Sequence, residues 1–431
     1  MSFANTLSDA QRKRARIHAY ASTWFGCISE VMLDSSAIII LFLTMLGGSE
    51  TLTMFSTSLS GIVFMFMMIP CAGFVDRFGL KRSVTLACSM GCIGYLLMAS
   101  APFFGMELAQ YVVLAGCLIY CISRPIYGAT WYPLLDNFLL PSDRAVFFGF
   151  MRFSYMILSG VIFFLAGLAM GKEPPVWLMQ VFIAAAGLCV LGRKFFVDKF
   201  PLESQSPATY DLKKALGISI KNGPLIGFSI YVCCLTAANC SIIPLAFIYL
   251  KKQLGLGDNV VQIISAIGIG GTICGYFVFG KLLKFLSMKR LQIMTHIAYI
   301  LIPLALFFSG SNIGGYVYVI AALLFIGNFF CACFYCSFST EMLALAHPGN
   351  KTMAAAFCQT YYYIGTAGGR LSTSIMLGSG ILMPIWSKWN ISFCKFQSLF
   401  LIYAALAAFF LILLLGLPSV VPEHKDYYEP R

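Results

Sequence analysis

Twelve apolar stretches of about 20 residues or more run through this chain of 431 residues, and they limit its fold more than any other feature. A helix of that length spans the roughly 30 Å hydrocarbon core of a bilayer. In lipid, only helices and closed barrels satisfy their own backbone hydrogen bonds, and apolar runs this long are typical of helices. We therefore predict an all-α polytopic membrane protein. The expected spans are residues 17–46, 51–72, 83–101, 108–139, 146–170, 175–196, 224–250, 258–280, 291–309, 315–343, 352–379 and 393–417.

The composition agrees with a lipid environment. Hydrophobic residues make up 59% of the chain and charged residues 11%, against roughly 45–50% and about 25% in soluble globular proteins. This balance excludes the soluble, disordered and collagenous classes. The first residues lack the short apolar core and small-residue cleavage site of a signal peptide, so we expect the mature chain to begin near Met1.

The basic residues predict the orientation of the chain. The formal net charge of +12 comes from dispersed residues rather than one basic face, so we expect no nucleic-acid partner. With the N-terminus inside, 21 of the 29 Lys and Arg residues, Arg193 among them, fall on inside segments and five on outside segments. Because cytoplasmic loops are rich in Lys and Arg, we expect cytoplasmic termini and a location in the plasma (inner) membrane. Three arginines remain inside spans: Arg124, Arg152 and Arg370.

The sequence shows few signs of a metal site or a catalytic site. Nearly all of the 16 cysteines lie in apolar runs, where they act as small buried hydrophobes. Cys333 and Cys336 have a metal-ligand spacing, but no second cysteine pair or nearby histidine accompanies them, so we expect no metal and no cofactor. The four histidines fall at or near the ends of spans, and no catalytic constellation is visible at a common depth. We therefore do not expect an enzyme.

The chain divides into two halves. The polar, basic segment 197–223 predicts a cytoplasmic linker between an N-terminal six-helix bundle, residues 1–196, and a C-terminal one, residues 224–420, with a tail at 421–431. AGFVDRFGLKR, which follows the second span, and GKLLKFLSMKR, which follows the eighth, form a weak internal repeat. Many transporters are built from parallel repeats of this kind. We expect a monomer.

The first of these segments resembles the signature loop of the major facilitator superfamily. The residues that carry the resemblance are Asp76, Arg77, Gly79, Lys81 and Arg82. It implies two six-helix halves, a tight turn between the second and third helices, and an Asp that pairs across to the other half in one conformation. In the fourth span, Arg124 and Gly128 are similar to the family's Arg-x-x-x-Gly element, which implies proton coupling or substrate binding. The glycine-proline run of proton-coupled exporters is missing from residues 146–170.

Two carboxylates in the first span are candidates for the proton site. Glu30 and Asp34 lie one helical turn apart on one face, about 6 Å from each other. A charge at the bilayer centre costs several kcal/mol, so such residues usually have a function. Two carboxylates this close in low dielectric are rarely both ionised. We predict that the pair binds a transported proton; the alternative is that one carboxylate merely pairs with an arginine.

The arginines inside the spans are candidates for the substrate site. Arg124 lies at the depth of the two carboxylates and keeps its charge, so it needs an anionic partner. That partner is Asp34 or Glu30 when these are ionised and a substrate anion when they are protonated; the alternative is a permanent structural ion pair. Arg370 is a second substrate contact or extends to the outer interface, and Arg152 pairs with Asp136. Further candidate contacts are Trp131, Asn239, Gln359, Tyr361 and Tyr362.

These expectations combine into one function. The sequence predicts a proton-coupled secondary transporter, a symporter of a small organic anion such as a carboxylate, sugar acid or phosphate ester, that works by alternating access in the lipid bilayer. The alternative is a proton-coupled antiporter that exports drugs or other cationic or zwitterionic molecules. The missing glycine-proline run and the arginines inside the spans favour the symporter.

Overall fold

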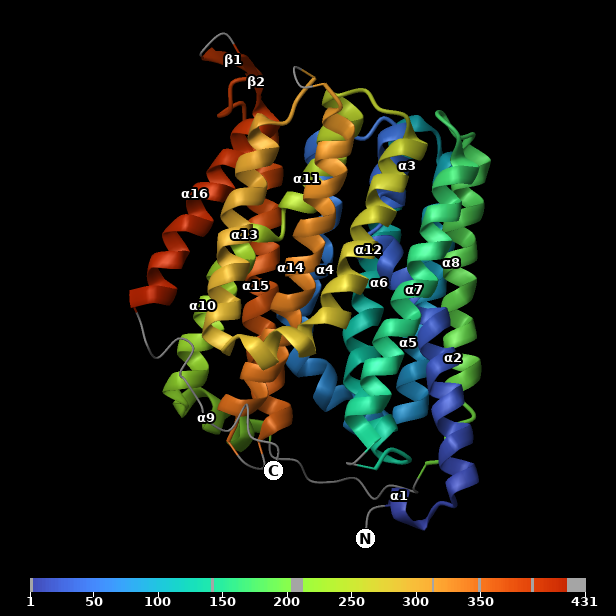
Figure 1. The fold of residues 1–431 in the computed structure, drawn as a ribbon. Coiled ribbons are helices and arrows are strands. Elements are labelled where there is room, and N and C mark those ends of the chain that lie inside the picture. Colours follow the sequence, from blue (N-terminus) through green and yellow to red (C-terminus); the bar gives the residue numbers. More distant parts are fainter. Residues whose placement is uncertain are drawn as a thin grey trace.

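The computed structural model describes residues 3–140, 143–202, 212–311, 314–347, 350–388 and 391–416. These residues form a bundle of long helices with short connections (Figure 1). The predicted all-α fold is confirmed, and the strands of the described residues are one short antiparallel hairpin, β1 (Ile385–Lys388) and β2 (Ile391–Cys394). We call the end of the bundle with the hairpin the upper end and the end with α1 (Phe3–Thr6) the lower end, as drawn.

The helices follow the expected spans in order. In the first half these are α2 (Asp9–Asp34), α3 (Ile38–Met45), α4 (Glu50–Phe78), α5 (Leu80–Ser100), a 3-10 turn (Ala101–Phe104), α6 (Met106–Asp136), α7 (Arg144–Met170) and α8 (Val176–Val197). In the second half they are α9 (Leu212–Lys221), α10 (Gly223–Asn239), α11 (Ile242–Ile248), a π-helical turn (Tyr249–Gln253), α12 (Asp258–Phe285), α13 (Met288–Phe308), α14 (Tyr316–Leu345), α15 (Lys351–Gly378) and α16 (Lys395–Gly416).

Ten helical stretches among the described residues are long and apolar enough to cross a membrane, and the bent pair α2 and α3 makes an eleventh. The remaining expected span, 352–379, falls on α15. With 28 residues it is long enough, but its many Thr, Tyr, Ser and Gly residues make it more polar than the others. The expected linker 197–223 is not wholly irregular, because α9 lies within it.

Two of the expected spans are not continuous helices. The first breaks at residues 35–37, where α2 and α3 meet at a bend of 52°, and the seventh breaks at residues 240–241 between α10 and α11. Each break overlaps a short polar run, which is Asp-Ser-Ser at residues 34–36 and Asn-Cys-Ser at residues 239–241. Asp, Asn and Ser side chains compete for backbone hydrogen bonds and so weaken a helix locally. Broken helices at corresponding positions of two halves are typical of transporter binding sites.

The two copies of the sequence repeat are tight turns. Helix α4 ends at Phe78 and α5 begins at Leu80, and Gly79 between them has a φ of 92°, which side-chain-bearing residues rarely adopt. In the second copy α12 ends at Phe285 and α13 begins at Met288. Lys81 donates a hydrogen bond to the carbonyl oxygen of Asp198, just after α8, at 2.9 Å. The side chain of Asp76 lies outside the described residues.

Candidate functional site

A cavity of about 300 Å³ lies between the two halves, at the level of the helix breaks. The first half contributes side chains from α2, α4, α6 and α7, and the second half from α10 to α15. Both helix breaks reach the cavity, through Ser35 and Cys240. The charged and amide side chains that line it are Glu30, Asp34, Arg124, Asn239, Asn328 and Arg370.

Asp34 and Arg124 form a two-pronged ion pair in the cavity wall. Asp34 is the last residue of α2, and Arg124 projects from the middle of α6. The guanidinium donates from Nη1 to Oδ1 at 3.0 Å and from Nη2 to Oδ2 at 2.6 Å, and from Nη1 to Ser60 Oγ at 3.0 Å. It also lies over the ring of Phe64, 5.2 Å from the ring centroid. Such planar, bidentate pairing requires arginine rather than lysine.

Glu30 has a different partner, Arg193, which by sequence counts among the basic residues of the inside segments. Arg193 Nη1 lies 2.6 Å from Glu30 Oε1, and its side chain is only 8% exposed. The guanidinium lies over the ring of Tyr127, 4.1 Å from the centroid. The expectation was wrong because Arg193 stands beside Lys194 near the end of a span, where basic residues usually meet the interface. The two carboxylates therefore do not share one arginine.

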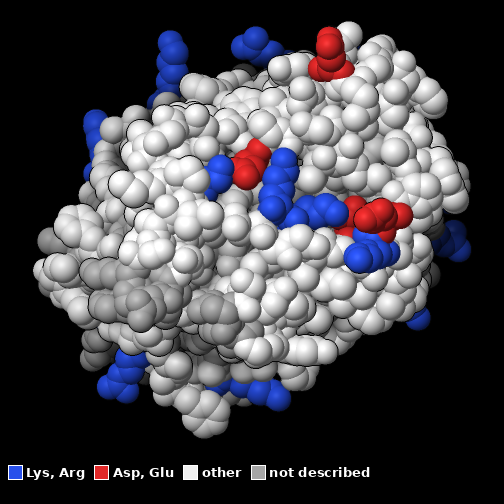
Figure 2. Space-filling model, turned by 90° about the horizontal axis from the view of Figure 1, so that it is seen from above, with Lys and Arg blue, Asp and Glu red and all other residues white. Residues whose placement is uncertain are grey.

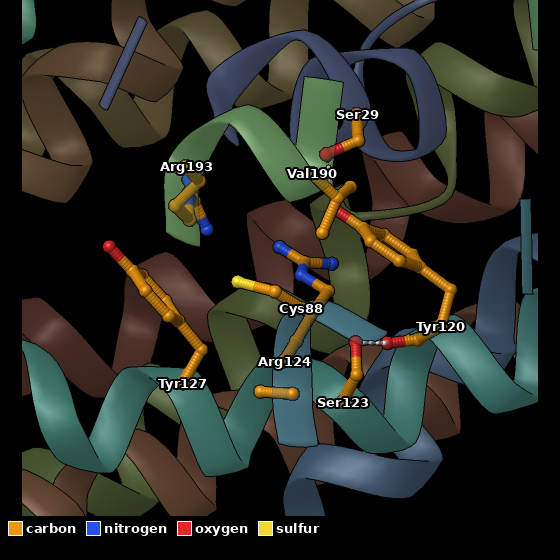
Figure 3. Close-up of a pocket in the computed structure, with 9 residues that line it drawn as sticks. Ser29, Cys88, Tyr120, Ser123, Arg124, Tyr127, Val190 and Arg193 are labelled. Carbon is orange, nitrogen blue, oxygen red and sulfur yellow. Dashed lines mark hydrogen bonds between the residues drawn. The ribbon is translucent and has the colours of Figure 1, made fainter. Parts of the chain in front are cut away.

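A small polar pocket separates the two ion pairs (Figure 3). Arg124 and Arg193 both line it, together with Ser29, Tyr120 and other residues of the first half. Tyr120 Oη donates to Ser29 Oγ at 3.0 Å, while Arg193 Nε is buried without a hydrogen-bond partner in the protein. The pocket volume is about 10 Å³, the space that one buried water molecule needs. The first half thus holds both pairs in one polar layer.

Arg370 also faces the cavity rather than the outer interface. Its Nε donates to the carbonyl oxygen of Cys240 at 3.2 Å, and its Nη1 donates to that of Thr57, in the other half, at 2.6 Å. Gly369 allows this approach, because a Cβ there would lie 2.4 Å from the carbonyl oxygen of Ala237. Within the described part of the chain, no carboxylate lies within ion-pair distance of Arg370. Among the described residues, the cavity therefore contains one cation that no carboxylate neutralises.

Some predicted contacts lie elsewhere. Asn239 and Tyr362 line the cavity, but Trp131, Gln359 and Tyr361 do not. Tyr361 packs on Phe357, with ring centroids 5.2 Å apart, and Trp131 lies next to Tyr127, 5.7 Å away. Arg152, which the sequence predicts to pair with Asp136, is not a lining residue either. Trp131, Gln359 and Tyr361 are therefore not contacts of this cavity.

The comparisons with known proteins decide the family. Residues 22–369 match the family model described as Major Facilitator Superfamily. The chain belongs to the Major Facilitator Superfamily. As members of this family are transporters, the protein is a multi-pass membrane transporter. A search of curated proteins found no match.

Solved structures share the fold of this superfamily member along nearly its whole length. The nucleoside transporter NupG, as a mutant, has a TM-score of 0.70 at 17% identity, with 94% of this chain and 99% of that chain covered. A D-xylose-proton symporter has a TM-score of 0.72 at 12% identity, covering 92% and 96%. The xylose transporter XylE from E. coli, partially occluded and inward open, has a TM-score of 0.68 at 12% identity, covering 97% and 99%.

The two halves of this superfamily member meet above the cavity. Gln262 of α12 accepts hydrogen bonds from Ser36 Oγ and Ala37 N, both at 3.2 Å, and donates to the carbonyl oxygen of Phe163 at 3.3 Å. At the upper end Lys395 pairs with Glu50. Figure 2 shows this end, where acidic and basic side chains gather near the middle of the face and other charged side chains lie toward its rim. These contacts hold the halves together on the upper side of the cavity.

Proposed function

We propose that this protein is a proton-coupled symporter of a small organic anion, such as a carboxylate, a sugar acid or a phosphate ester. The observation that carries the proposal is the charge around the cavity. Asp34 and Glu30 are each held by an arginine, and Arg370 adds a positive charge that no carboxylate neutralises among the described residues. An anion is the ligand that completes this arrangement, because an uncompensated charge in low dielectric is costly.

Arg124 supplies the coupling. A substrate anion that binds the guanidinium competes with Asp34 for the same hydrogen-bond donors. A carboxylate that loses its arginine inside a membrane protein is destabilised in its charged form and takes up a proton. Protonation of Asp34 likewise frees Arg124 for the substrate. Substrate and proton therefore favour each other's binding, as linkage requires.

The contacts between the halves support alternating access. If the termini are cytoplasmic, as the Lys and Arg distribution predicts, the upper end faces outside. The structure then corresponds to a state that is closed to the outside, and transport requires the upper contacts to break while contacts form at the lower end. Two structural neighbours are named as a proton symporter and as an inward-open transporter, which is consistent with this cycle.

The alternative, export of a cationic compound, would use Glu30 and Asp34 to attract the cation. Both carboxylates are already paired with arginines, at 2.6 Å each. The cavity lining of the described chain offers no further carboxylate. A cation would therefore have to displace a guanidinium, which makes this function the less favoured one.

Proteoliposome uptake tests the proposal. Purified protein is reconstituted and offered a labelled aliphatic carboxylate, a sugar acid and a sugar phosphate, with and without an inward proton gradient. We expect gradient-stimulated uptake of at least one of them. Uptake that is indifferent to the gradient would contradict proton coupling.

The variant Arg124→Lys tests the site itself. A lysine cannot make the bidentate pair or reach Ser60 at the same time, and charged hydrogen bonds contribute about 1.5–3 kcal/mol each. We expect gradient-driven uptake to fall at least about tenfold while the protein still inserts and stays folded. The matched control is Arg16→Lys, whose guanidinium pairs with Asp143 outside the cavity at 3.1 Å. Equal uptake by the two variants would show that Arg124 is not part of the substrate site.

A further inference from the structure

Aromatic side chains line the cavity mainly from the second half, whereas both ion pairs lie in the first half. Six of the seven aromatic lining residues come from the second half, and the seventh, Tyr155, comes from α7. Tyr299 and Phe334 are buried, whereas Tyr335 is more than one-third exposed in the cavity. The six residues, which we call the tyrosine wall, are Tyr276, Tyr299, Phe334, Tyr335, Tyr362 and Tyr363.

The tyrosine wall is continuous with the Arg124 site. The guanidinium of Arg124 lies over Phe64, and Tyr363 stacks on Phe64 with ring centroids 4.3 Å apart and an angle of 21° between the planes. Tyr362 meets Tyr363 edge to face at 5.2 Å, and Tyr335 lies 5.4 Å from Tyr362. A row of aromatic rings thus leads from the cation into the second half.

This arrangement gives the cavity two chemically different poles. One is cationic and lies at Arg124 and Arg370; the other is aromatic. Aromatic rings attract other flat rings in offset or edge-to-face geometry beyond the gain from area burial. A volume of about 300 Å³ is at the small end of ligand pockets, so it suits a molecule with one ring and small substituents.

The polar lining groups argue against a sugar acid. A sugar ring carries a hydroxyl group on most of its carbons, and each hydroxyl needs a hydrogen-bond partner once it leaves water. Ser60 accepts from Arg124, Asn328 Nδ2 donates to the Leu324 carbonyl oxygen and Thr366 donates to that of Tyr362. These three lining side chains therefore have only part of their hydrogen-bonding capacity left for a substrate. The tyrosine wall instead offers ring faces with hydroxyl groups at their edges.

We propose that the substrate is an aromatic carboxylate, a flat ring bearing one carboxylate group, with the carboxylate at Arg124 and Arg370 and the ring against Tyr362 and Tyr335. This inference rests on the proposed function and narrows its substrate class. The tyrosine wall then selects aromatic rings among carboxylates, whereas the arginines bind any carboxylate group.

Binding to the purified full-length protein tests the inference. The probes are benzoate, cyclohexanecarboxylate, glucuronate and benzylamine, measured by calorimetry at one pH. Benzoate and cyclohexanecarboxylate share a six-membered ring and a carboxylate but differ in aromaticity. We expect benzoate to bind about threefold to tenfold more tightly than cyclohexanecarboxylate, as stacking on an aromatic wall predicts, and more tightly than glucuronate.

Two tyrosines on one helix give a matched pair of variants. Tyr362→Leu removes a ring from the wall, whereas Tyr361→Leu changes the neighbouring residue, which lies outside the cavity lining. Tyr362→Leu should abolish the preference for benzoate over cyclohexanecarboxylate. Tyr361→Leu should retain this preference, and so should Tyr362→Phe, because phenylalanine keeps the ring. Arg124→Lys should weaken both carboxylates to the same extent.

The outcomes separate this inference from the function on which it rests. Equal binding of benzoate and cyclohexanecarboxylate, tighter binding of glucuronate, or an unchanged preference in Tyr362→Leu would overturn the aromatic substrate. Anion symport would survive each of these results as long as Arg124→Lys still weakens binding. Binding of benzylamine alone would overturn both. Binding of none of the three carboxylates would overturn the aromatic carboxylate and leave a phosphate ester as the anion of the proposed function.

Discussion

The guanidinium of Arg193 occupies the space that a side chain at position 26 would need. A Cβ added at position 26 would lie 1.6 Å from Arg193 Nε, so the guanidinium rests directly against the backbone of α2. Arginine keeps its charge in proteins and must stay with its carboxylate when buried. Glycine at position 26 is therefore a steric condition for the pair between Arg193 and Glu30, one helical turn further along α2.

The variant Gly26→Ala tests this dependence. The new methyl group displaces the guanidinium and leaves buried charges without good partners, a change that costs about 3 kcal/mol or more. We expect the free energy of unfolding, measured by thermal or denaturant unfolding in detergent, to fall by about that amount. The matched control is Gly128→Ala on α6, where an added Cβ meets nothing within 4 Å. Equal stability of the two variants would contradict the packing described here.

Single residues differ in how far the sequence could predict them. Arg124 and Asp34 lie well inside apolar spans, and the cost of a charge in lipid predicts a function for them. Arg193 has the same chemistry but stands next to Lys194 near the end of a span, so composition cannot distinguish it from an interfacial residue. The available signal was Gly26, four residues before Glu30 and on the same helix face.

At each helix break, one side chain forms hydrogen bonds that connect the break to the opposite half. Gln262 of the second half binds the break between α2 and α3, at Ser36 and Ala37. Arg370 binds the break between α10 and α11 at Cys240 and reaches Thr57 in the first half. A change in the relative position of the halves therefore changes the support of both breaks.

The variant Gln262→Leu tests this coupling. Leucine leaves the Ala37 N–H and the Phe163 carbonyl without their partner, at a cost of about 1–3 kcal/mol for each unsatisfied buried group. We expect the state closed at the upper end to become less populated, so that a membrane-impermeant thiol reagent applied outside modifies Cys240 faster. Gln180→Leu, which removes a hydrogen bond to Ala99 within one half, should leave that rate unchanged. An unchanged rate in Gln262→Leu would contradict the coupling.

The helices themselves were predictable and their breaks were not. Length and hydropathy locate eleven of the expected spans among the described helices, and the twelfth, 352–379, falls on the more polar α15. The breaks contain neither glycine nor proline, and the polar runs that cause them, at residues 34–36 and 239–241, also occur in intact helices. Their stability depends on Gln262 and Arg370, which lie far away in the sequence.

At the scale of the whole molecule, the halves are joined at the upper end by contacts that the proposed alternating-access cycle has to break. The pair Glu50–Lys395 and the hydrogen bond from Lys252 to the carbonyl oxygen of Gly48 both cross between halves. Partly exposed ion pairs contribute up to about 1 kcal/mol. These two contacts therefore favour the state closed at the upper end but are weak enough to break.

Charge reversal tests this bias. Glu50→Lys replaces attraction by repulsion at Lys395, and the outside modification rate of Cys240 should rise by up to about fivefold. The double variant Glu50→Lys with Lys395→Glu should restore the original rate. Lys194→Glu, which breaks a pair with Asp198 inside the first half, serves as the control. A double variant as reactive as Glu50→Lys alone would contradict a direct interaction.

The repeat of spans and the polar linker predict two halves, but nothing in the sequence predicts the conformational state. In the proposed cycle one sequence adopts an arrangement closed at the upper end and another open there, since alternating access moves the halves of transporters largely as rigid bodies. The contacts at the upper end, such as Gln262 with Ala37, are visible only in the structure. They identify the residues that the proposed cycle separates.

Proton coupling at Asp34 is tested most directly with the variant Asp34→Asn in proteoliposomes, using an anion that the wild-type protein accumulates. Asparagine resembles a protonated carboxyl group, so Arg124 stays free for the substrate at every pH. We expect this variant to exchange labelled for unlabelled anion across the membrane, while an inward proton gradient no longer drives accumulation. Accumulation by Asp34→Asn as strong as that of the wild type would contradict coupling through Asp34 and Arg124.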